Sequence, residues 1–381
     1  MTSAKGLKPD GASLRAAEFF AGIGLVRQAL EEAGVEVVFA NDINPIKGKV
    51  YVANFGEEHF VLGDIAKVPV ESIPDVDIAT ASFPCTDLSL AGNRAGLNGA
   101  ESGAFWLFAD LLQSLAGRAP RVILLENVAG LGTSRQGADL RDAISRLNEL
   151  GYTCDLFQVD ASRWVPQSRV RVFVVGAREP TAYPGDWGPD ELRPAWISSF
   201  VRHNQELVMR PSRLKLPPPA SGVLADYIDR QSVPASKWWD EERLARFQSS
   251  LSPIQAARLE DLRRRQTTTW RTAYRRTRKG VAVWEIRNDE ISGCLRTARG
   301  GSSRQALVEA GRGRVRVRWM SSREYAALMG AAGHILDVVS ENQALFGLGD
   351  AVAVPAMRWL LSEYVVPLAR GDMGRAAANV A

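Results

Sequence analysis

Residues 15–42, "RAAEFFAGIGLVRQALEEAGVEVVFAND", contain a strand pattern, a glycine turn, a helix pattern and a second strand pattern in direct succession. The apolar run "RAAEFF" leads through "AGIG" into "LVRQALEEAG", where apolar residues recur at helical spacing up to Gly34. The run "VEVVFAND" then has the character of a buried strand. This order predicts a βαβ unit with parallel strands.

The same alternation continues to about residue 180. Further strand-like runs are "DIATASF", "RVILLEN", "CDLFQVD" and "VRVFVVGA", and the helical patterns "GAFWLFADLLQSLAG" and "LRDAISRLNELG" lie between them. We therefore expect an α/β fold, with a mostly parallel sheet covered by helices on both faces. Ligands of such sheets bind beyond the carboxyl ends of the strands, where Gly22, Asp42, Cys85 and Glu126 fall.

The alternation stops after Pro180. Residues 181–290 are rich in proline, tryptophan and arginine, and "LPPPASG" indicates a linker. Helical patterns return from Ser321. The predicted parts are a disordered lead-in (1–14), a catalytic and cofactor domain (15–180), a smaller, irregular, basic domain (181–315) and a helical segment that returns to the first domain (316–381).

The 381-residue chain has 46% hydrophobic and 24% charged residues, which is typical of a soluble globular protein. No apolar run approaches the roughly 20 residues of a membrane span, and the N-terminus lacks the apolar core of a secretory signal. The three cysteines are far apart and odd in number, and the three histidines are scattered. We therefore expect a cytoplasmic protein with no disulfide framework, no membrane association and no metal site.

Basic residues are concentrated although the net charge is only +4. Residues 261–280, "DLRRRQTTTWRTAYRRTRKG", hold seven arginines and a lysine against one acid. Trp270 and Tyr274 lie among these arginines. This mixture favours contacts with phosphates and bases, and a merely solvated basic face is the alternative.

The turn "AGIG" is a candidate nucleotide site. Gly22 and Gly24 let the backbone approach a ligand, and the following helix offers unpaired N–H groups. Asp42 ends the next strand, where a carboxylate can accept the ribose hydroxyls, and Asp64 in "GDI" could accept from an adenine amino group. These features in order predict an adenosine ligand, although glycine turns alone are common in α/β domains.

The stretch at residues 82–89, "SFPCTDLS", places Cys85 where a buried strand opens into a loop. A lone cysteine is usually a small buried hydrophobic residue. Here Pro84 restricts the backbone, and the following loop carries glycines at 92, 96, 99 and 103. Such a loop can open and close over a site.

Charged residues at neighbouring strand ends complete this candidate site. In "LLENV", Glu126 follows an apolar run, where a buried carboxylate is costly unless it is used or paired. In "QSRVR", Arg169 and Arg171 are two residues apart, so we expect both to point to one face of a strand. An ion pair with a core acid is the alternative role for these arginines.

The motifs "EFFAGIG", "FPC", "ENV", "QSRVR", "GCLRTARGGSSRQ" and "FGLGDAVAVPAM" occur in this order. Together they resemble the C5-cytosine DNA methyltransferases over about residues 16–360. The resemblance implies a Rossmann-like methyltransferase fold that uses S-adenosylmethionine, which leaves as S-adenosylhomocysteine. It also implies that residues 181–315 form a target-recognition domain that binds duplex DNA.

The resemblance assigns roles to the candidate catalytic residues. Cys85 would add as a thiolate to C6 of a cytosine rotated out of the duplex, which makes C5 nucleophilic. Glu126 would contact N3 and the exocyclic amine, with a raised carboxyl pKa, and Arg171 would contact O2. Arg169 would support the thiolate and its loop.

It also implies two sets of binding residues and no metal. The methyl donor would be held by Phe20, Gly22, Ile23, Gly24, Asp42, Ile43, Asp64, Ile65, Pro84, Asp350 and Ala351. The DNA would be contacted by Ser89, Arg94, Arg296, Ser303 and Arg304.

Three residues depart from the family pattern: Thr86 replaces a common glutamine, Leu25 a common glycine and Asp350 a frequent asparagine. We expect a monomer that acts on DNA in the nucleoid, with a restriction endonuclease or other defence proteins as candidate partners.

Other classes of protein are the alternatives to this prediction. A transfer-RNA methylating enzyme would carry a Cys-Phe-Thr tripeptide, which is absent. A catalytically silent DNA-binding relative is disfavoured by the intact Cys85, Glu126 and Arg171. A flavin or nicotinamide enzyme, or an N-methylating DNA enzyme, leaves "FPC", "ENV" and "QSRVR" without a role.

Overall fold

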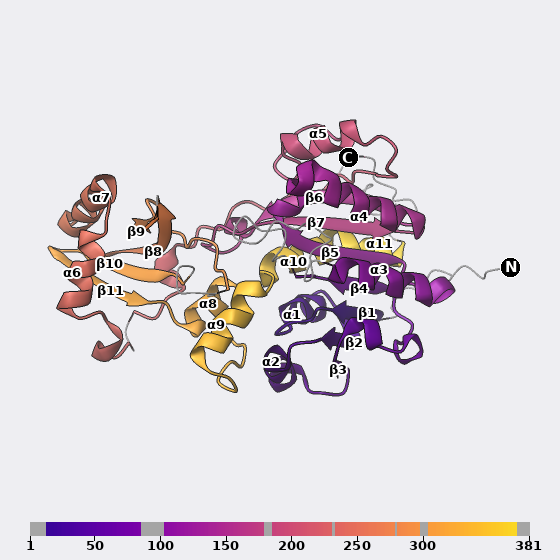
Figure 1. The fold of residues 1–381 in the computed structure, drawn as a ribbon, viewed down its shortest axis with the longest axis horizontal. Coiled ribbons are helices and arrows are strands. Elements are labelled where there is room, and N and C mark those ends of the chain that lie inside the picture. The colour runs from indigo at the N-terminus through magenta and orange to yellow at the C-terminus, as the bar shows by residue number, and fades with distance from the viewer. Residues whose placement is uncertain are drawn as a thin grey trace. The chain divides into compact units, whose positions relative to one another are not determined.

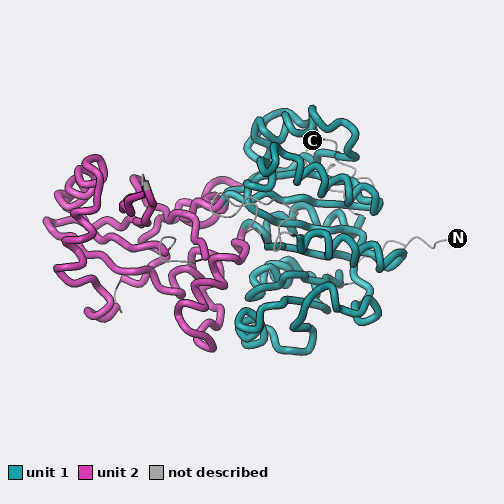
Figure 2. The backbone as a smooth tube through the Cα atoms, in the orientation of Figure 1, with its two compact units in different colours: residues 1–160, 170–216, 356–381 teal, residues 161–169, 217–355 magenta. Residues whose placement is uncertain are grey.

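The structure is a computed structural model that describes residues 13–84, 103–178, 185–230, 233–278, 280–297 and 304–371. The chain divides into two compact units (Figure 2). Unit 1 comprises residues 1–160, 170–216 and 356–381, and unit 2 comprises residues 161–169 and 217–355. Residues 181–216 therefore group with unit 1 and residues 316–355 with unit 2, unlike the predicted domain boundaries.

Unit 1 is built on a seven-stranded sheet in the order β3-β2-β1-β4-β5-β7-β6 (Figure 1). All described strand pairs in it are parallel except those of β7, which runs antiparallel to both β5 and β6. The predicted mostly parallel sheet is confirmed. The strands are β1 (Leu14–Phe19), β2 (Val35–Asp42), β3 (Phe60–Leu62), β4 (Ile78–Ala81), β5 (Val122–Val128), β6 (Thr153–Asp160) and β7 (Val170–Ala177).

Helices cover the sheet of unit 1. Side chains of α3 and α4 share one core with Ala17 and Phe19 of β1. The sequence analysis did not predict helix α2 (Pro45–Phe55) or the three-residue strand β3. The side chain of Asn44 caps α2 by accepting from the N–H groups of Ile46 and Lys47. The helices are α1 (Leu25–Glu32), α2 (Pro45–Phe55), α3 (Ala104–Leu115), α4 (Ala138–Glu149), α5 (Ala195–His203) and α11 (Val366–Arg370). Short helical turns are η1 (Ile65–Lys67), η2 (Val70–Ser72), η4 (Ala116–Arg118), η5 (Ala129–Gly132), η6 (Ser134–Gly137) and the π-helical η10 (Leu361–Val365).

Unit 2 contains a regular four-stranded antiparallel sheet in the order β11-β10-β8-β9. The prediction of an irregular domain is therefore wrong. Arginines occupy many strand positions here, and Arg271, Arg276, Arg316 and Arg318 pair with carboxylates. Their long stems can pack as apolar groups, so the strand pattern is hidden in the sequence. The elements are α6 (Glu241–Ser249), α7 (Pro253–Arg264), β8 (Thr269–Arg278), β9 (Val281–Ile286), β10 (Ala306–Gly311), β11 (Arg314–Trp319), α8 (Ser322–Leu328) and α9 (Glu341–Asp350), with η7 (Ala161–Arg163), η8 (Leu224–Asp226) and η9 (Ala235–Lys237). Helix α10 (Val354–Leu360) crosses the boundary between the units.

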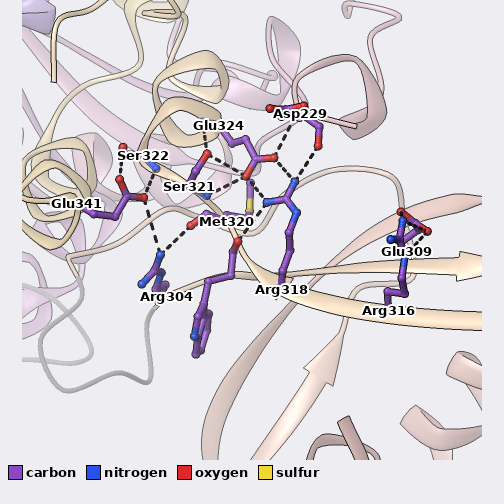
Figure 3. A network of polar contacts seen from close by, with 11 residues as sticks. Asp229, Arg304, Glu309, Arg316, Arg318, Met320, Ser321, Ser322, Glu324 and Glu341 are labelled. Atoms are coloured by element: carbon purple, nitrogen blue, oxygen red, sulfur yellow. Dashed lines mark hydrogen bonds and ion pairs between the residues drawn. The ribbon is translucent and has the colours of Figure 1, made fainter. Parts of the chain in front are cut away.

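A buried ion pair joins β11 to α8 within unit 2 (Figure 3). Arg318 donates to both carboxylate oxygens of Glu324 and to the carbonyl oxygen of Asp229. Glu324 also accepts from the N–H of Ser321, which caps α8. These bonds link β11 and α8 within residues 316–355, which group with unit 2.

A second buried network binds residues 185–216 to unit 1. Arg193 donates to the carboxylate of Asp155 on β6 at 3.0 Å and to the carbonyl oxygen of Ser212 at 2.9 Å. Asp155 also accepts from the Ser212 N–H at 2.7 Å and from the Tyr364 hydroxyl at 3.2 Å. Burial raises the pKa of Asp155 to about 6, although Arg193 and these N–H donors oppose the shift.

One helical stretch of the described residues, Glu341–Arg370, has the length and composition of a membrane span, with 72% of its most apolar window buried inside the structure. The expectation that no segment approaches a span is wrong on that criterion. A buried core helix meets the same criterion, so the stretch is a weak sign of a membrane.

Replacement of Arg193 by glutamine is expected to lower the free energy of unfolding by about 3–5 kcal/mol, because it leaves the buried Asp155 carboxylate uncompensated. Without Arg193 the folded-state pKa of Asp155 lies still further above its unfolded value. The variant then loses more stability than wild type as the pH rises. The difference between their free energies of unfolding is therefore larger at about pH 8 than at about pH 5. Urea unfolding at both pH values measures it.

Arg141→Gln is the matched control, because Arg141 forms an exposed pair with Asp142. Its expected effect is within about 0.5 kcal/mol at either pH. Equal losses in the two variants would contradict a structural role for the Arg193–Asp155 pair.

Candidate cofactor and catalytic site

The candidate residues of unit 1 gather at one edge of its sheet. Parallel register aligns Phe19 of β1 with Asn41 of β2 and Ala81 of β4, and Ala81 with Leu125 of β5. Strand β7 is antiparallel, so its first residues lie at that same edge, where Arg171 pairs with Val128. The carboxyl ends of four strands and the amino end of β7 therefore form one border.

The glycine turn has the backbone conformation that its sequence predicts. Gly22 and Gly24 have φ angles of 59° and 86°, in the left-handed region. A Cβ at Gly24 would lie 2.4 Å from the ring of Phe55, so any larger residue is excluded by space as well as conformation. Phe20 also has a positive φ of 57°, which is uncommon for a bulky residue and is typical of functional sites.

Asp42 holds this turn in place. Its buried carboxylate accepts from the N–H of Gly22 and from the N–H of Asn44, both at 2.7 Å. Each carboxylate oxygen retains acceptor capacity for a further donor such as a hydroxyl. The next side chain, Ile43, is 66% exposed, so it offers an apolar surface beside that carboxylate.

Asp64 and Ile65 follow β3. Asp64 accepts from the N–H of Ala66 at 3.0 Å and so caps η1, while Ile65 is buried. The side-chain amide of Asn41, which the sequence did not single out, donates to the carbonyl oxygens of Val61 and Gly63. Asn41 thereby ties the segment that carries Asp64 to the end of β2.

Glu18 on β1 is a site residue that the sequence analysis missed. Its side chain is buried, and neither carboxylate oxygen has a hydrogen-bond partner in the described part of the chain. Burial raises the pKa of Glu18 to about 8, although the charge of Arg27 opposes the shift, so the carboxyl is largely protonated at neutral pH. The signal was present in "RAAEFF", where one acid interrupts an apolar strand.

The chain that leads to residue 85 is anchored from β5. Asn127 donates from its side-chain amide to the carbonyl oxygen of Phe83 at 3.1 Å. Phe83 packs on Phe105 of α3 with ring centroids 5.6 Å apart. Pro84 follows and is exposed. The predicted residues Cys85, Thr86, Ser89, Arg94 and Ser303 lie outside the described residues.

Glu126 and Arg171 form an ion pair at this border. Arg171 Nε lies 2.9 Å from Glu126 Oε1, and the two side chains are 14% and 7% exposed. The Arg171 guanidinium also donates to the carbonyl oxygen of Val170. The structure thus brings together two of the four predicted catalytic residues, and the pair is buried enough for a strong electrostatic interaction.

Arg169 has different partners. Its buried guanidinium donates to the carbonyl oxygens of Leu295 at 2.7 Å, Gly349 at 3.1 Å and Ala351, all in unit 2. The expectation that both arginines share one strand face fails because Arg169 precedes the first residue of β7, where strand alternation does not apply.

The remaining described candidates of unit 2 are Arg296, Arg304, Asp350 and Ala351. Asp350 is the exposed last residue of α9, and Ala351 follows it as the helix cap. A Cβ at Gly349 would lie 2.4 Å from the backbone nitrogen of Thr297, so this turn packs closely against the exposed Arg296 and its neighbour. Arg304 is half-buried, lies two residues before β10 and donates to the carbonyl oxygen of Met320 at 3.1 Å (Figure 3).

No group of three or more histidine, cysteine, aspartate or glutamate side chains that could hold a metal occurs in the described ranges. The donors gathered at the border are suited to an organic ligand: backbone N–H groups, one carboxylate with free acceptor capacity and an exposed aliphatic side chain. These features fit an adenosine-containing molecule.

Comparison with known proteins matches residues 14–365 to the family described as C-5 cytosine-specific DNA methylase. Type II methyltransferase M.NgoBI of Neisseria gonorrhoeae is 36% identical over 160 residues, which cover 42% of this chain and 49% of the relative. Type II methyltransferase M.HhaI of Haemophilus parahaemolyticus is 34% identical over 163 residues, covering 42% and 48%. The match therefore spans about half the length of these relatives.

Solved structures show the same fold. The Entamoeba histolytica methyltransferase EhMeth superposes with a TM-score of 0.64 at 15% identity, covering 95% of this chain and 99% of that one. The S. pombe Dnmt2 methyltransferase superposes with a TM-score of 0.59 at 20% identity, covering 93% and 99%. Since the family match extends over nearly the whole described chain, this protein belongs to the C-5 cytosine-specific DNA methylase family.

Proposed function

We propose that this protein is an enzyme that transfers a methyl group from S-adenosylmethionine to C5 of a cytosine in duplex DNA. The observation that carries the proposal is the buried Glu126–Arg171 pair at the border where Pro84 leads to Cys85 and where the glycine turn lies. A nucleophile, a carboxyl and a guanidinium are the groups that activation of a pyrimidine ring requires.

Cys85 supplies the nucleophile in this mechanism. Its thiolate forms a bond to C6, and the electrons of the C5–C6 double bond make C5 able to attack a methyl group. S-adenosylmethionine, when bound, supplies that methyl on a sulfonium. A base then removes the C5 proton and the sulfur–C6 bond breaks, which restores the ring and frees the cysteine.

Glu126 and Arg171 hold the ring while charge moves through it. The Glu126 carboxyl contacts N3 and the exocyclic amine, and Arg171 donates to O2, where negative charge develops. Their ion pair aligns both side chains before the base arrives, so little reorganisation is needed at the moment of reaction. The Asn127 bond to the Phe83 carbonyl fixes the chain just before the cysteine.

The donor is held by the glycine turn and its neighbours. Phe20, Gly22, Ile23 and Gly24 would line its methionine end, together with Pro84, Asp350 and Ala351. Asp42, already oriented by two N–H donors, would accept the ribose hydroxyls, and Ile43, Asp64 and Ile65 would surround the adenine. The protonated Glu18 lies in β1, directly before this turn, and would add no negative charge there.

The substrate is a base that must leave the helical stack, since the reacting carbons are shielded inside a duplex. The relatives named Type II methyltransferases support a partnership with a restriction endonuclease that acts on the same sequence. We place the protein in the cytoplasm, on nucleoid DNA. Methylation of transfer RNA by the same chemistry is the competing function, and the first test below separates the two.

A duplex that carries 5-fluorocytosine is expected to form a covalent adduct with this protein in the presence of S-adenosylmethionine, because fluorine cannot leave C5 as a proton does. Cys85→Ala should form none. Denaturing gel electrophoresis of labelled DNA measures the adduct.

Cys294→Ala is the control, because Cys294 is a partly exposed cysteine that the proposed mechanism does not use. The Cys294→Ala variant should form the covalent adduct as wild type does. An adduct in Cys85→Ala would disprove the role of Cys85 as the nucleophile, and adducts with RNA alone would show that the substrate is RNA.

Glu126→Gln is expected to lower the rate of methyl transfer by about 10²–10⁴-fold, because the amide cannot exchange a proton with the ring. DNA affinity should change little. Transfer of a tritiated methyl group under single-turnover conditions measures the step, and Glu149→Gln, an exposed carboxylate of unit 1, serves as control. A rate within twofold of wild type would exclude Glu126 from catalysis.

A further inference from the structure

The loop between β6 and β7, residues 161–169, leaves the sheet of unit 1 and groups with unit 2. The two strands pair up to the last position before the loop, where Asp160 lies opposite Val170. Both ends of the loop are therefore fixed by the sheet. Val170 alone separates Arg169, the last residue of the loop, from Arg171 on β7.

Gln167 anchors this loop through its side chain, which is fully buried. Its Nε2 donates to the carbonyl oxygen of Leu328 at the end of α8 at 2.8 Å, and its Oε1 accepts from the N–H of Leu295 at 3.3 Å. A carboxamide is suited to this position because it both donates and accepts. The motif "QSRVR" contains this glutamine, but neither the sequence analysis nor the proposed mechanism gives it a role.

The backbone of the loop is also paired within unit 2. The Ser168 N–H donates to the carbonyl oxygen of Ser292 at 2.9 Å, and the Ser292 N–H donates to the carbonyl oxygen of Pro166 at 2.6 Å. Ser292 is fully buried. Gln167 lies between these two bonds, so its backbone and its side chain are both held, and the loop moves as a part of unit 2.

The loop holds the backbone of Leu295 on both sides. The Leu295 N–H donates to Gln167, and its carbonyl oxygen accepts from Arg169 Nη1 at 2.7 Å. The next residue is the exposed Arg296, one of the expected DNA contacts. Arg169 also donates to the carbonyl oxygen of Gly349, where a Cβ would lie 2.5 Å from the carbonyl carbon of Arg296. The backbone that carries Arg296 is therefore attached to the loop.

Arg171, on the other side of Val170, belongs to the pair that is proposed to hold the cytosine ring. Its Nε lies 2.9 Å from Glu126 Oε1 within unit 1. The described backbone contains no cis peptide bond, and consecutive Cα atoms are held about 3.8 Å apart across a trans peptide. A displacement of Arg169 is therefore passed to Arg171 through a single residue.

We propose that Gln167 is a positioning residue for methyl transfer, an inference that rests on the proposed function. By holding the loop to Leu295, Gln167 makes the position of Arg171 depend on the position of Arg296. Contact of Arg296 with DNA then favours the loop position in which Arg171 is aligned with the base. A small shift is sufficient, because misplacement by about 1 Å can lower a rate about 10²-fold.

Gln167→Met in the full-length chain preserves the length of the side chain and removes both hydrogen bonds. We expect the single-turnover rate of methyl transfer at saturating DNA and donor to fall about 10–100-fold. The dissociation constants of DNA and of S-adenosylhomocysteine should change less than about threefold, because Gln167 contacts neither. Transfer of a tritiated methyl group to a DNA fragment that wild-type protein methylates measures the rate. Fluorescence anisotropy and equilibrium dialysis measure the two affinities.

Gln158→Met is the matched control. Gln158 lies on β6 of the same strand pair, and its side-chain oxygen accepts from the indole N–H of Trp196 at 2.8 Å, so the substitution also removes a hydrogen bond. That bond lies within unit 1. The rate of Gln158→Met should stay within about twofold of wild type. Melting temperatures of all variants establish that the chains are folded.

A double-mutant cycle tests the coupling itself. In the wild-type background, Arg296→Gln is expected to weaken DNA binding and to lower the rate at saturating DNA about tenfold, because the loop is then less well fixed. In the Gln167→Met background, the same substitution should weaken DNA binding as before but lower the rate less than about twofold, since the linkage is already broken. A merely structural role of Gln167 would leave the two effects on the rate equal.

A second pair of variants tests the linkage without a change at Gln167. Val170→Gly adds backbone freedom between the two arginines, whereas Val170→Ala removes most of the same side chain and keeps the backbone restricted. We expect Val170→Gly to lower the rate about tenfold and Val170→Ala to stay within about threefold of wild type. Neither substitution removes a side-chain hydrogen bond of Gln167, Arg169 or Arg171.

The inference is overturned if Gln167→Met transfers the methyl group at a rate within about twofold of wild type. It is equally overturned if Arg296→Gln lowers the rate by the same factor in both backgrounds, or if glycine and alanine at position 170 act alike. Each of these results leaves methyl transfer by wild-type protein intact. Failure of the proposed function is different, because wild-type protein would then neither trap 5-fluorocytosine DNA nor methylate any duplex.

Discussion

The reversed direction of β7 is the constraint on which the site depends. Because β7 lies antiparallel between β5 and β6, its amino end meets the carboxyl end of β5. Arg171 therefore lies beside Glu126, and the two charges can share a buried border at 2.9 Å. A parallel β7 would carry its first residues to the opposite edge of the sheet, and Glu126 would lose this partner.

The carboxylates at this border are controlled by what surrounds them. Asp42 accepts two backbone N–H bonds, which orient it and fix the glycine turn. Glu126 is paired with a guanidinium. Among the residues that the structure describes, neither oxygen of Glu18 has a hydrogen-bond partner, and burial raises its pKa to about 8 against the opposing charge of Arg27. Three acids at one edge of the sheet therefore have different surroundings: backbone N–H donors for one, a guanidinium for the second and an apolar interior for the third.

The arginines of unit 2 divide in a similar way. Arg318 has a buried carboxylate partner and joins β11 to α8, and Arg271 on β8 is buried and paired with Glu290. Arg318 also lies over the indole of Trp238, and Arg243 and Arg304 lie over the indoles of Trp239 and Trp319. The composition predicted a basic domain but could not separate these classes, because a count of charges does not show which arginine lies against which carboxylate.

Local patterns in the sequence were sufficient for most strands of unit 1 and for several of its candidate residues, although they missed α2, β3 and Glu18. Period-two and helical apolar spacing located six of the strands, and the order of short motifs pointed to Asp42, Glu126 and Arg171. Only the tertiary structure decided which side chains meet: that Arg171 pairs with Glu126 while Arg169 binds carbonyl groups of unit 2, that Glu18 is protonated, and that the arginine-rich segments pair into a sheet. These outcomes depend on strand direction and on desolvation by residues far away in the chain, and neither is encoded in local periodicity.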